Sequence, residues 1–505
     1  MFDVLNKSNT PIFVNVLRPT LFFLKLMVPF YVLFLVLRIA FLWVYPLEFS
    51  ELTGFQTIYT MAKGAWFFDT SITLIFLGIP FLLAYLPWRW CSSSVYLRLI
   101  AWYAFLVLCF FTFISIGDLL YFGIVHRHAG SEVGAALESS SLSMAVMLVS
   151  EYWFYMLLML VVVIGISGLW RRWFATPEEV DEQPALGWKR APLFFFVFII
   201  ILLGMRGGIE SKPIQVVFAY NEGSMAQGHL ALNGAFSVLH GLKKSKMKTP
   251  HYMEQVDAIR IAQQELASPY ELVPDPEFPL MRERTSILGE TGKPNIVILL
   301  LESWDSDFLD ITRELDGKEP YRISPNFNEL AKEGRLYTNF YANGQRSIDG
   351  ISSLIAGIPS IPFAGSLGKG IESNHLGWLG NIAKSQGYQT SFLSGSFRAS
   401  FYMDKISPLA GFDTYLGSQD LHTNLHPNAP SSAWGGWDYD LLKTASQMYA
   451  KEKKPFISVV FSVSTHSPWA LPDEKWKRFP HDSNENKFKN TIYYTDWVLG
   501  EFFLM

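Results

Sequence analysis

Three residues in the C-terminal half of the chain have types and positions that could do chemistry together. Glu302 ends the apolar run NIVILLLE, which predicts a short buried strand. Ser347 follows Arg346 and lies just before DGISSLIAGI, which predicts a helix. His466 lies in STHSPW, directly after another apolar run. A carboxylate can ligate a metal ion, and a serine hydroxyl can be activated as a nucleophile.

Each of these residues also has a plainer interpretation. Glu302 could be a solvated residue at a strand end or a helix cap, and Ser347 could be an N-cap that satisfies a backbone amide. Arg346 could form a surface salt bridge, and His466 could be a turn histidine. Their joint placement at the ends of predicted elements favours a shared site.

The elements around these residues alternate between strand and helix patterns. Strands are predicted over 294–301, 335–343, 389–396 and 455–465, and helices over 324–334, 349–358, 378–388, 440–453 and 490–503. This alternation predicts a mostly parallel sheet with helices on both faces. Ligands bind beyond the carboxyl ends of such strands, so Glu302, Ser394–Ser396 and Thr465–His466 are expected to face one crevice.

The N-terminal half has the composition of a membrane domain. The 505-residue chain is 50% hydrophobic and 16% aromatic, and the apolar excess lies in residues 19–206. Five stretches have about the length that a bilayer requires. They lie near 20–45, 70–88, 99–125, 146–170 and 189–206.

Lys and Arg are richer in alternate loops, which predicts a cytoplasmic N-terminus and an extracytoplasmic C-terminal domain. The predicted organisation is a transmembrane domain over 1–206, a connector over 207–290 that partly forms a membrane-surface helix, and a globular domain over 291–505. Asp118, in the third stretch, is either a functional intramembrane residue or a solvated residue near the outer end of its helix.

Charge and topology exclude some function classes. The net charge of −4 gives no basic footprint for nucleic acid. A transporter is disfavoured, because five spans without an obvious repeat precede a large external domain.

The motifs together resemble a known family, the membrane-anchored phosphoglycerol transferases of the alkaline phosphatase superfamily, which include lipoteichoic acid synthase. The resemblance rests on five predicted helices before the globular domain and on the order of PNIVILLLES, SPNFNELAKEG, NGQRSIDGISSLIAGIP, GYQTSFLSGS, GFDTYLG, STHSPW and YYTDWVLGEFF. It implies an alkaline-phosphatase-like (sulfatase) α/β domain after the multi-pass helical domain.

The resemblance also implies an activity and roles for individual residues. Ser347 matches the nucleophile and Glu302 a metal ligand. His466, Arg346 and Arg398 are expected to contact substrate. The expected cofactor is a divalent cation, with Mn²⁺ favoured over Mg²⁺ or Zn²⁺. The expected reaction moves phosphoglycerol from a phospholipid, such as phosphatidylglycerol, to a hydroxyl of an envelope glycan or lipid at the bacterial plasma (inner) membrane.

The sequence departs from the family pattern in two places, which keeps alternatives open. Family His, Asp, Trp and Arg positions read Ser394, Ser396, Phe401 and Met403 here, although Arg398 could compensate. The family's later Asp-His pair and a further His are expected beyond residue 505, so the domain is expected to be C-terminally incomplete. The alternatives are a phosphoethanolamine transferase and a catalytically incomplete membrane-anchored binding protein. A sulfatase is disfavoured because x-Pro-x-Arg does not follow Ser347.

Overall fold

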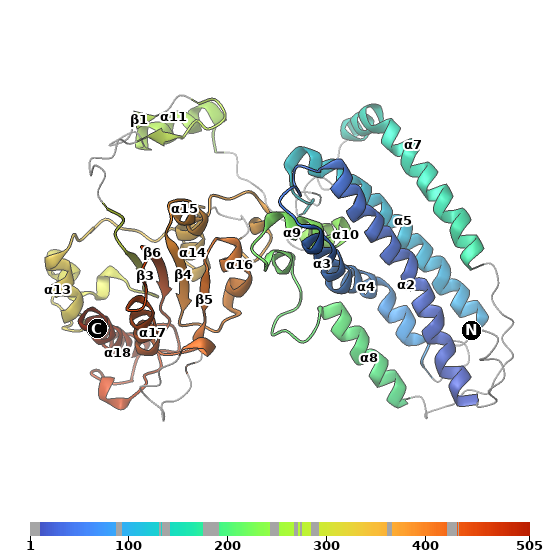
Figure 1. Ribbon diagram of the computed structural model, residues 1–505. Coiled ribbons are helices and arrows are strands. Elements are labelled where there is room, and N and C mark those ends of the chain that lie inside the picture. Colours follow the sequence, from blue (N-terminus) through green and yellow to red (C-terminus); the bar gives the residue numbers. More distant parts are fainter. Residues whose placement is uncertain are drawn as a thin grey trace.

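The chain forms two bodies joined by a connector, as the computed structural model shows (Figure 1). One is a bundle of long helices from the N-terminal half, and the other is a sheet with helices from the C-terminal half. The structure describes residues 11–86, 93–130, 133, 142–174, 191–242, 252–266, 271–272, 275–283, 292–360, 366–421, 432 and 434–505.

A helix lies over each of the five predicted membrane spans. These helices are α2 (Pro11–Val44), α3 (Gly54–Gly64) continued through the π-helical turn η1 (Ala65–Asp69) into α4 (Thr70–Leu83), α5 (Ser94–Val125), α7 (Leu142–Trp173) and α8 (Ala191–Arg206). Among the described residues, three stretches are long and apolar enough to cross a membrane: Thr20–Val44, Gly54–Leu83 and Ser94–Val125. At 16 residues, α8 is shorter than a span normally requires.

The second span begins at Gly54 rather than near residue 70, where the sequence placed it. Two of the polar residues that hid this start, Thr60 and Lys63, have partners within the protein. Thr60 is buried, and Lys63 Nζ lies 2.7 Å from the Glu222 carboxylate of the connector. Hydropathy therefore underestimates the length of this helix, because the partners of its polar side chains come from a distant part of the chain.

A buried ion pair ties the bundle to the connector. Arg38 forms a forked pair with Asp69, with nitrogen–oxygen distances of 2.6 and 2.8 Å, and both side chains are almost fully buried. Arg38 also donates to the carbonyl oxygens of Leu230 and Ala231, and Asn233 Nδ2 donates to Asp69 over 2.7 Å. Arg38 therefore faces protein inside the bundle, where its charge is matched and hydrogen-bonded.

We expect Asp69→Ala to lower the free energy of unfolding by about 3–5 kcal/mol, because it leaves the buried Arg38 guanidinium without its carboxylate. Thermal unfolding of the detergent-solubilised chain measures this loss. The matched control is Glu222→Ala, which removes a more exposed carboxylate and should cost only about 0–1 kcal/mol. Equal losses in the two variants would contradict this account of the buried pair.

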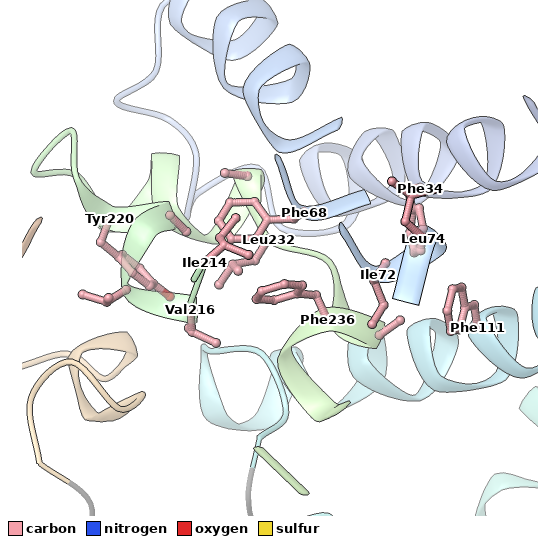
Figure 2. Packing of buried hydrophobic residues seen from close by; sticks show 14 of the residues in the cluster. Phe34, Phe68, Ile72, Leu74, Phe111, Ile214, Val216, Tyr220, Leu232 and Phe236 are labelled. Carbon is pink, nitrogen blue, oxygen red and sulfur yellow. The ribbon is translucent and has the colours of Figure 1, made fainter. Parts of the chain in front are cut away.

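The first part of the connector lies between the two bodies, whereas α11 (Gln255–Leu266), β1 (Glu271–Leu272) and β2 (Arg282–Glu283) stand apart from them (Figure 1). The part of the connector predicted as a membrane-surface helix, residues 229–242, falls within α9 (Met225–Ala231) and α10 (Gly234–Leu242), and residues 226–238 are buried. Phe236 packs edge-on against Phe68 with 5.0 Å between ring centres (Figure 2). Whether any of it also touches the membrane surface stays a prediction.

The buried core continues from the bundle into the globular half through the short helix η4 (Val216–Tyr220). The Phe218 ring lies 5.8 Å from that of Tyr402, and Lys212 Nζ donates to the carbonyl of Ala399 over 2.6 Å. The two bodies are therefore in direct contact through side chains.

Asp118 is neither solvated nor free, which corrects the expectation that it could be a wet residue at a helix end. It is 2% exposed, and its carboxylate forms a 2.6 Å hydrogen bond with His128 Nδ1. The Ala129 amide donates to its other oxygen over 2.7 Å. The chain turns back at His126, where φ is 55°, and this turn brings His128 onto the helix end.

The globular half contains the predicted parallel sheet, with strand order β3-β6-β4-β5. The strands are β3 (Ile296–Leu300), β4 (Gln389–Ser394), β5 (Thr414–Leu416) and β6 (Phe456–Phe461). All pairings in this sheet are parallel, and the register places Val459 of β6 beside Ile298 on one side and Phe392 on the other. The carboxyl ends of β3, β4 and β6 therefore meet at one edge.

Helices cover both faces of this sheet because neighbouring residues of a strand point to opposite sides. Phe392 and Val459 pack with α14 and α16, and Leu393 and Val460 pack with α17 and α18. The helices of this half are α12 (Asp310–Leu315), α13 (Pro325–Glu333), α14 (Ser347–Ala356), α15 (Leu379–Ser385), α16 (Met403–Leu409), α17 (Asp438–Tyr449) and α18 (Asn484–Leu504).

Three strand predictions need correction. Residues 335–343 form no strand, and Tyr337, Phe340 and Tyr341 are exposed there, so the aromatic pattern does not reflect burial in the sheet. β3 lies at an edge of the sheet, and Ile296 and Val297 are more than one-third exposed, not buried as predicted. β5 was missed because it has only three residues.

Candidate active site

Ser347 and Glu302 meet at the carboxyl edge of the sheet. The Ser347 hydroxyl donates a hydrogen bond to Glu302 Oε2 over 2.8 Å. Glu302 comes just after β3, and Ser347 is the first residue of α14. The N-cap of α14 is Arg346, and no side chain caps this helix. The N-cap interpretation of Ser347 is therefore wrong, and its hydroxyl is directed at a carboxylate instead.

Glu302 is held by the loop that follows β6. Its amide donates to Ser462 Oγ over 2.8 Å, and the Thr465 hydroxyl donates to its carbonyl oxygen. Ser303 Oγ donates to Glu302 Oε1 over 2.8 Å and has a positive φ of 56°. Such a backbone conformation is strained for a residue with a side chain and is common at functional sites. The carboxylate is thus fixed by both its backbone and its side chain.

Asp438 in turn fixes the loop after β6. Its carboxylate accepts from the Val463 amide over 2.8 Å and from the Ser464 amide over 3.1 Å. Its own amide donates to Ser464 Oγ over 3.0 Å. Burial raises the pKa of Asp438 to about 6, against the lowering effect of these hydrogen bonds, and the negative charge of Glu302 adds a smaller increase.

The raised pKa of Asp438 predicts a pH dependence of stability. The folded state holds this proton more tightly than the unfolded state, so the chain loses stability as pH rises from about 4 to about 6. The shift from 3.8 to about 6 corresponds to about 3 kcal/mol. Asp438→Asn should remove this part of the slope in thermal unfolding measured across the same pH range. An unchanged slope in the variant would show that other groups cause it.

Arg346 forms a salt bridge with a residue of the helix that it precedes. Its guanidinium donates to both oxygens of Asp349 over 3.0 and 2.8 Å, and its side chain is 57% exposed. The structure therefore shows the plainer salt bridge for Arg346. Its guanidinium nevertheless remains accessible to an anion, since Asp349 uses only part of its five N–H donors.

His466 and Arg398 lie in neighbouring loops. His466 Nδ1 forms a 2.8 Å hydrogen bond with the Ser467 carbonyl, and its ring lies 4.1 Å from that of Trp434. Arg398 donates to the Tyr415 carbonyl over 3.2 Å and pairs with Asp420. No contact of either residue with Ser347 or Glu302 is recorded in the part of the chain that the structure describes. Their roles in binding substrate stay predictions.

The serines at the end of β4 do not face an open crevice as expected. Ser394 and Ser396 are buried, and their hydroxyl oxygens lie 2.7 Å apart. They satisfy each other at the strand end, so they strengthen the local turn instead of presenting polar atoms to a ligand.

The Ser347–Glu302 pair has donor atoms of the type that a divalent cation prefers, but it supplies too few ligands for a complete site. Both donors are oxygen atoms, which suit Mg²⁺ and Mn²⁺ better than softer ligands do. However, no group of three or more His, Cys, Asp or Glu side chains that could hold a metal occurs among the described residues. A complete coordination shell therefore needs ligands beyond those that these residues bring together.

Sequence reasoning missed Ser462 and Asp438, which support the pair. Ser462 was hidden within the predicted strand 455–465, although β6 ends at Phe461. Asp438 lies just before the predicted helix 440–453, and an acidic residue at a helix start is usually explained by the helix dipole. Only the tertiary structure shows that its carboxylate binds the next loop.

Comparisons with known proteins identify the class of this domain. Residues 294–504 match the family Sulfatase. This match, together with the parallel sheet and its carboxyl-edge pair, shows that the C-terminal half is similar to a sulfatase domain.

Two curated relatives make the resemblance more specific. The chain is 26% identical over 228 residues to a lipoteichoic acid synthase of Staphylococcus saprophyticus. This match covers 42% of the chain and 33% of the relative. The chain is also 24% identical over 297 residues to phosphoglycerol transferase I of Citrobacter koseri. That match covers 54% of the chain and 38% of the relative. The matches thus span between 33% and 38% of the relatives' length. They confirm the predicted resemblance to this group of proteins.

A solved structure also matches. A protein of the alkaline phosphatase superfamily from Vibrio parahaemolyticus is 27% identical, with a TM-score of 0.42, and the match covers 50% of this chain and 59% of that one.

Proposed function

We propose that the chain transfers a phosphoglycerol group from a membrane phospholipid to a hydroxyl of an envelope glycan or lipid. The donor is phosphatidylglycerol, and the protein acts at the bacterial inner membrane with its sulfatase-type domain outside the cytoplasm. The observation that carries the proposal is the 2.8 Å hydrogen bond from the Ser347 hydroxyl to Glu302 Oε2 at the sheet edge. The similarity of the curated relatives supports the same group of reactions.

In the first half-reaction, Ser347 Oγ attacks the phosphorus of the donor. A bond from Oγ to phosphorus forms, the bond from phosphorus to the diacylglycerol oxygen breaks, and diacylglycerol leaves with a proton. Glu302 Oε2 is placed to hold the proton of the Ser347 hydroxyl as the attack proceeds. The acceptor hydroxyl oxygen then attacks the same phosphorus, the bond from Ser347 Oγ to phosphorus breaks, and the acceptor proton passes through Glu302 to Ser347 Oγ.

The surrounding residues favour an anion at this point. Ser347 opens α14, and the amides at a helix N-terminus attract negative charge. Arg346 adds a half-exposed positive charge beside it. A divalent cation held by Glu302 and Ser347 would lower the pKa of the hydroxyl and neutralise phosphoryl oxygens.

The test is release of fluorescent diacylglycerol from labelled phosphatidylglycerol by the protein, purified in detergent and supplied with Mn²⁺. We expect turnover with phosphatidylglycerol and none with labelled phosphatidylcholine. Turnover with phosphatidylethanolamine in place of phosphatidylglycerol would favour the alternative of phosphoethanolamine transfer. Absence of turnover with all three lipids would contradict a transferase.

A further inference from the structure

A cavity of about 190 Å³ opens between α5 and α7, far from the Ser347–Glu302 pair. It is lined by Arg98, Ala101, Trp102, Trp170, Arg171 and Phe174. Arg98 lies in the first turns of α5, and Arg171 lies in the last turn of α7. The cavity is therefore at the end of the bundle away from the sulfatase-type domain, beside the start of α2 (Figure 1).

Aromatic rings form a firm wall for this cavity. Trp170 is buried, and its ring lies 4.6 Å from that of Phe174 and 5.7 Å from that of Phe105. Lys25 Nζ of α2 lies 5.3 Å from the Phe174 ring and brings a third cation close to the cavity. Trp and Tyr gather at the level of lipid headgroups in membrane proteins, because their rings combine an apolar body with a polar group.

The two arginines of the cavity differ from three other cations of the bundle, which have polar partners within the protein. Arg38 and Lys63 have carboxylate partners, and Arg206 donates to two backbone carbonyls. Arg98 and Arg171 are exposed, and the ion pairs recorded among the described residues of the bundle include neither of them. Two guanidinium groups from different helices thus converge on one space lined with aromatic rings.

We propose that this cavity binds the phosphodiester headgroup of an anionic membrane lipid, in the leaflet opposite the sulfatase-type domain. Arginine recognises phosphate oxygens through charge-assisted, often bidentate hydrogen bonds. Basic pockets between membrane helices are a known form of headgroup site. The cavity is several times the volume of about 30 Å³ that a water molecule takes in the liquid, so it has room for a phosphate-sized group.

This site is separate from the donor site proposed above, which lies at the opposite end of the molecule. Because Arg98 belongs to α5 and Arg171 to α7, a lipid bound by both joins these two helices. Binding to the folded state alone stabilises it by mass action. An anionic lipid should therefore raise the unfolding temperature of the bundle, whereas a zwitterionic lipid should have little effect.

The test is native mass spectrometry of the full chain in detergent, titrated with short-chain phosphatidylserine, short-chain phosphatidylcholine or inorganic phosphate. Phosphatidylserine carries the required phosphodiester and net charge without being the proposed donor. We expect the wild type to retain phosphatidylserine about tenfold more tightly than phosphatidylcholine, and the double variant Arg98→Gln/Arg171→Gln to lose this preference. Phosphate alone should compete weakly, because it lacks the acyl chains.

Arg172→Gln is the matched control, because Arg172 has the same charge at the same helix end but does not line the cavity. It should keep the preference, as should Ser347→Ala. Equal loss in Arg172→Gln would overturn the site in favour of a general charge effect. Equal retention of phosphatidylcholine would overturn it as well, and equal competition by phosphate would replace the lipid by a free anion. Size-exclusion profiles that match the wild type show that each variant is folded.

Discussion

Ser347→Ala should abolish transfer, with a loss of roughly 10⁴-fold or more in kcat. Alanine removes Oγ, the atom that forms the bond to phosphorus in the first half-reaction. The fold should survive, because Ser347 is the first residue of α14 and its hydroxyl does not cap the helix. The measurement is release of fluorescent diacylglycerol from phosphatidylglycerol, compared with the wild type at equal protein concentration.

The matched control for this prediction is Ser353→Ala on the same helix. The Ser353 hydroxyl donates to the carbonyls of Asp349 and Ile358 and has no contact with Glu302. Its removal should leave turnover within about threefold of the wild type, since a single hydrogen bond of this kind contributes only about 1 kcal/mol to stability. If Ser347→Ala retained comparable turnover, Ser347 could not be the nucleophile.

Glu302→Gln should lower kcat by roughly 10²–10⁴-fold, the contribution typical of a general acid or base. Glutamine keeps the size of the side chain, and the backbone bonds to Ser462 and Thr465 remain available. It loses the negative charge that receives the Ser347 proton and that would bind a cation. KM for the lipid should change little, so the loss should appear in kcat.

A second variant distinguishes the catalytic contribution of the Glu302 carboxylate from its contribution to the fold of the loop. Ser462→Ala removes the acceptor for the Glu302 amide but leaves the carboxylate in place. We expect a smaller loss in Ser462→Ala, about tenfold, through poorer positioning of Glu302. An equal loss in the two variants would mean that the carboxylate contributes only to the fold of the loop.

Much of the site could be predicted from sequence because it depends on strand ends. The apolar runs that became β3, β4 and β6 end one to four residues before the predicted ends, and a parallel sheet brings their carboxyl ends to one edge. That rule was enough to place Glu302 near the loop of Thr465 and His466. The contact with Ser347 followed from the resemblance and from its position before a helix.

The rest depends on contacts that local patterns do not encode. Asp438 looks like an ordinary acidic helix start, and only the folded chain shows it accepting two amides of the loop after β6. Likewise, the start of α3 was missed because Thr60 and Lys63 read as polar, although connector residues far along the chain bury or pair them. The aromatic residues of 335–343 have strand propensity, but the structure gives them no neighbouring strand.

The central claim is that Ser347 carries a phosphoglycerol group between donor and acceptor. The most direct test is rapid quenching of the protein with phosphatidylglycerol in the absence of acceptor, followed by proteolysis and mass spectrometry of the peptide that contains Ser347. We expect glycerophosphate on Ser347 in the wild type and none on the same peptide in Ser347→Ala. Turnover without this adduct, or an adduct on another residue, would contradict it.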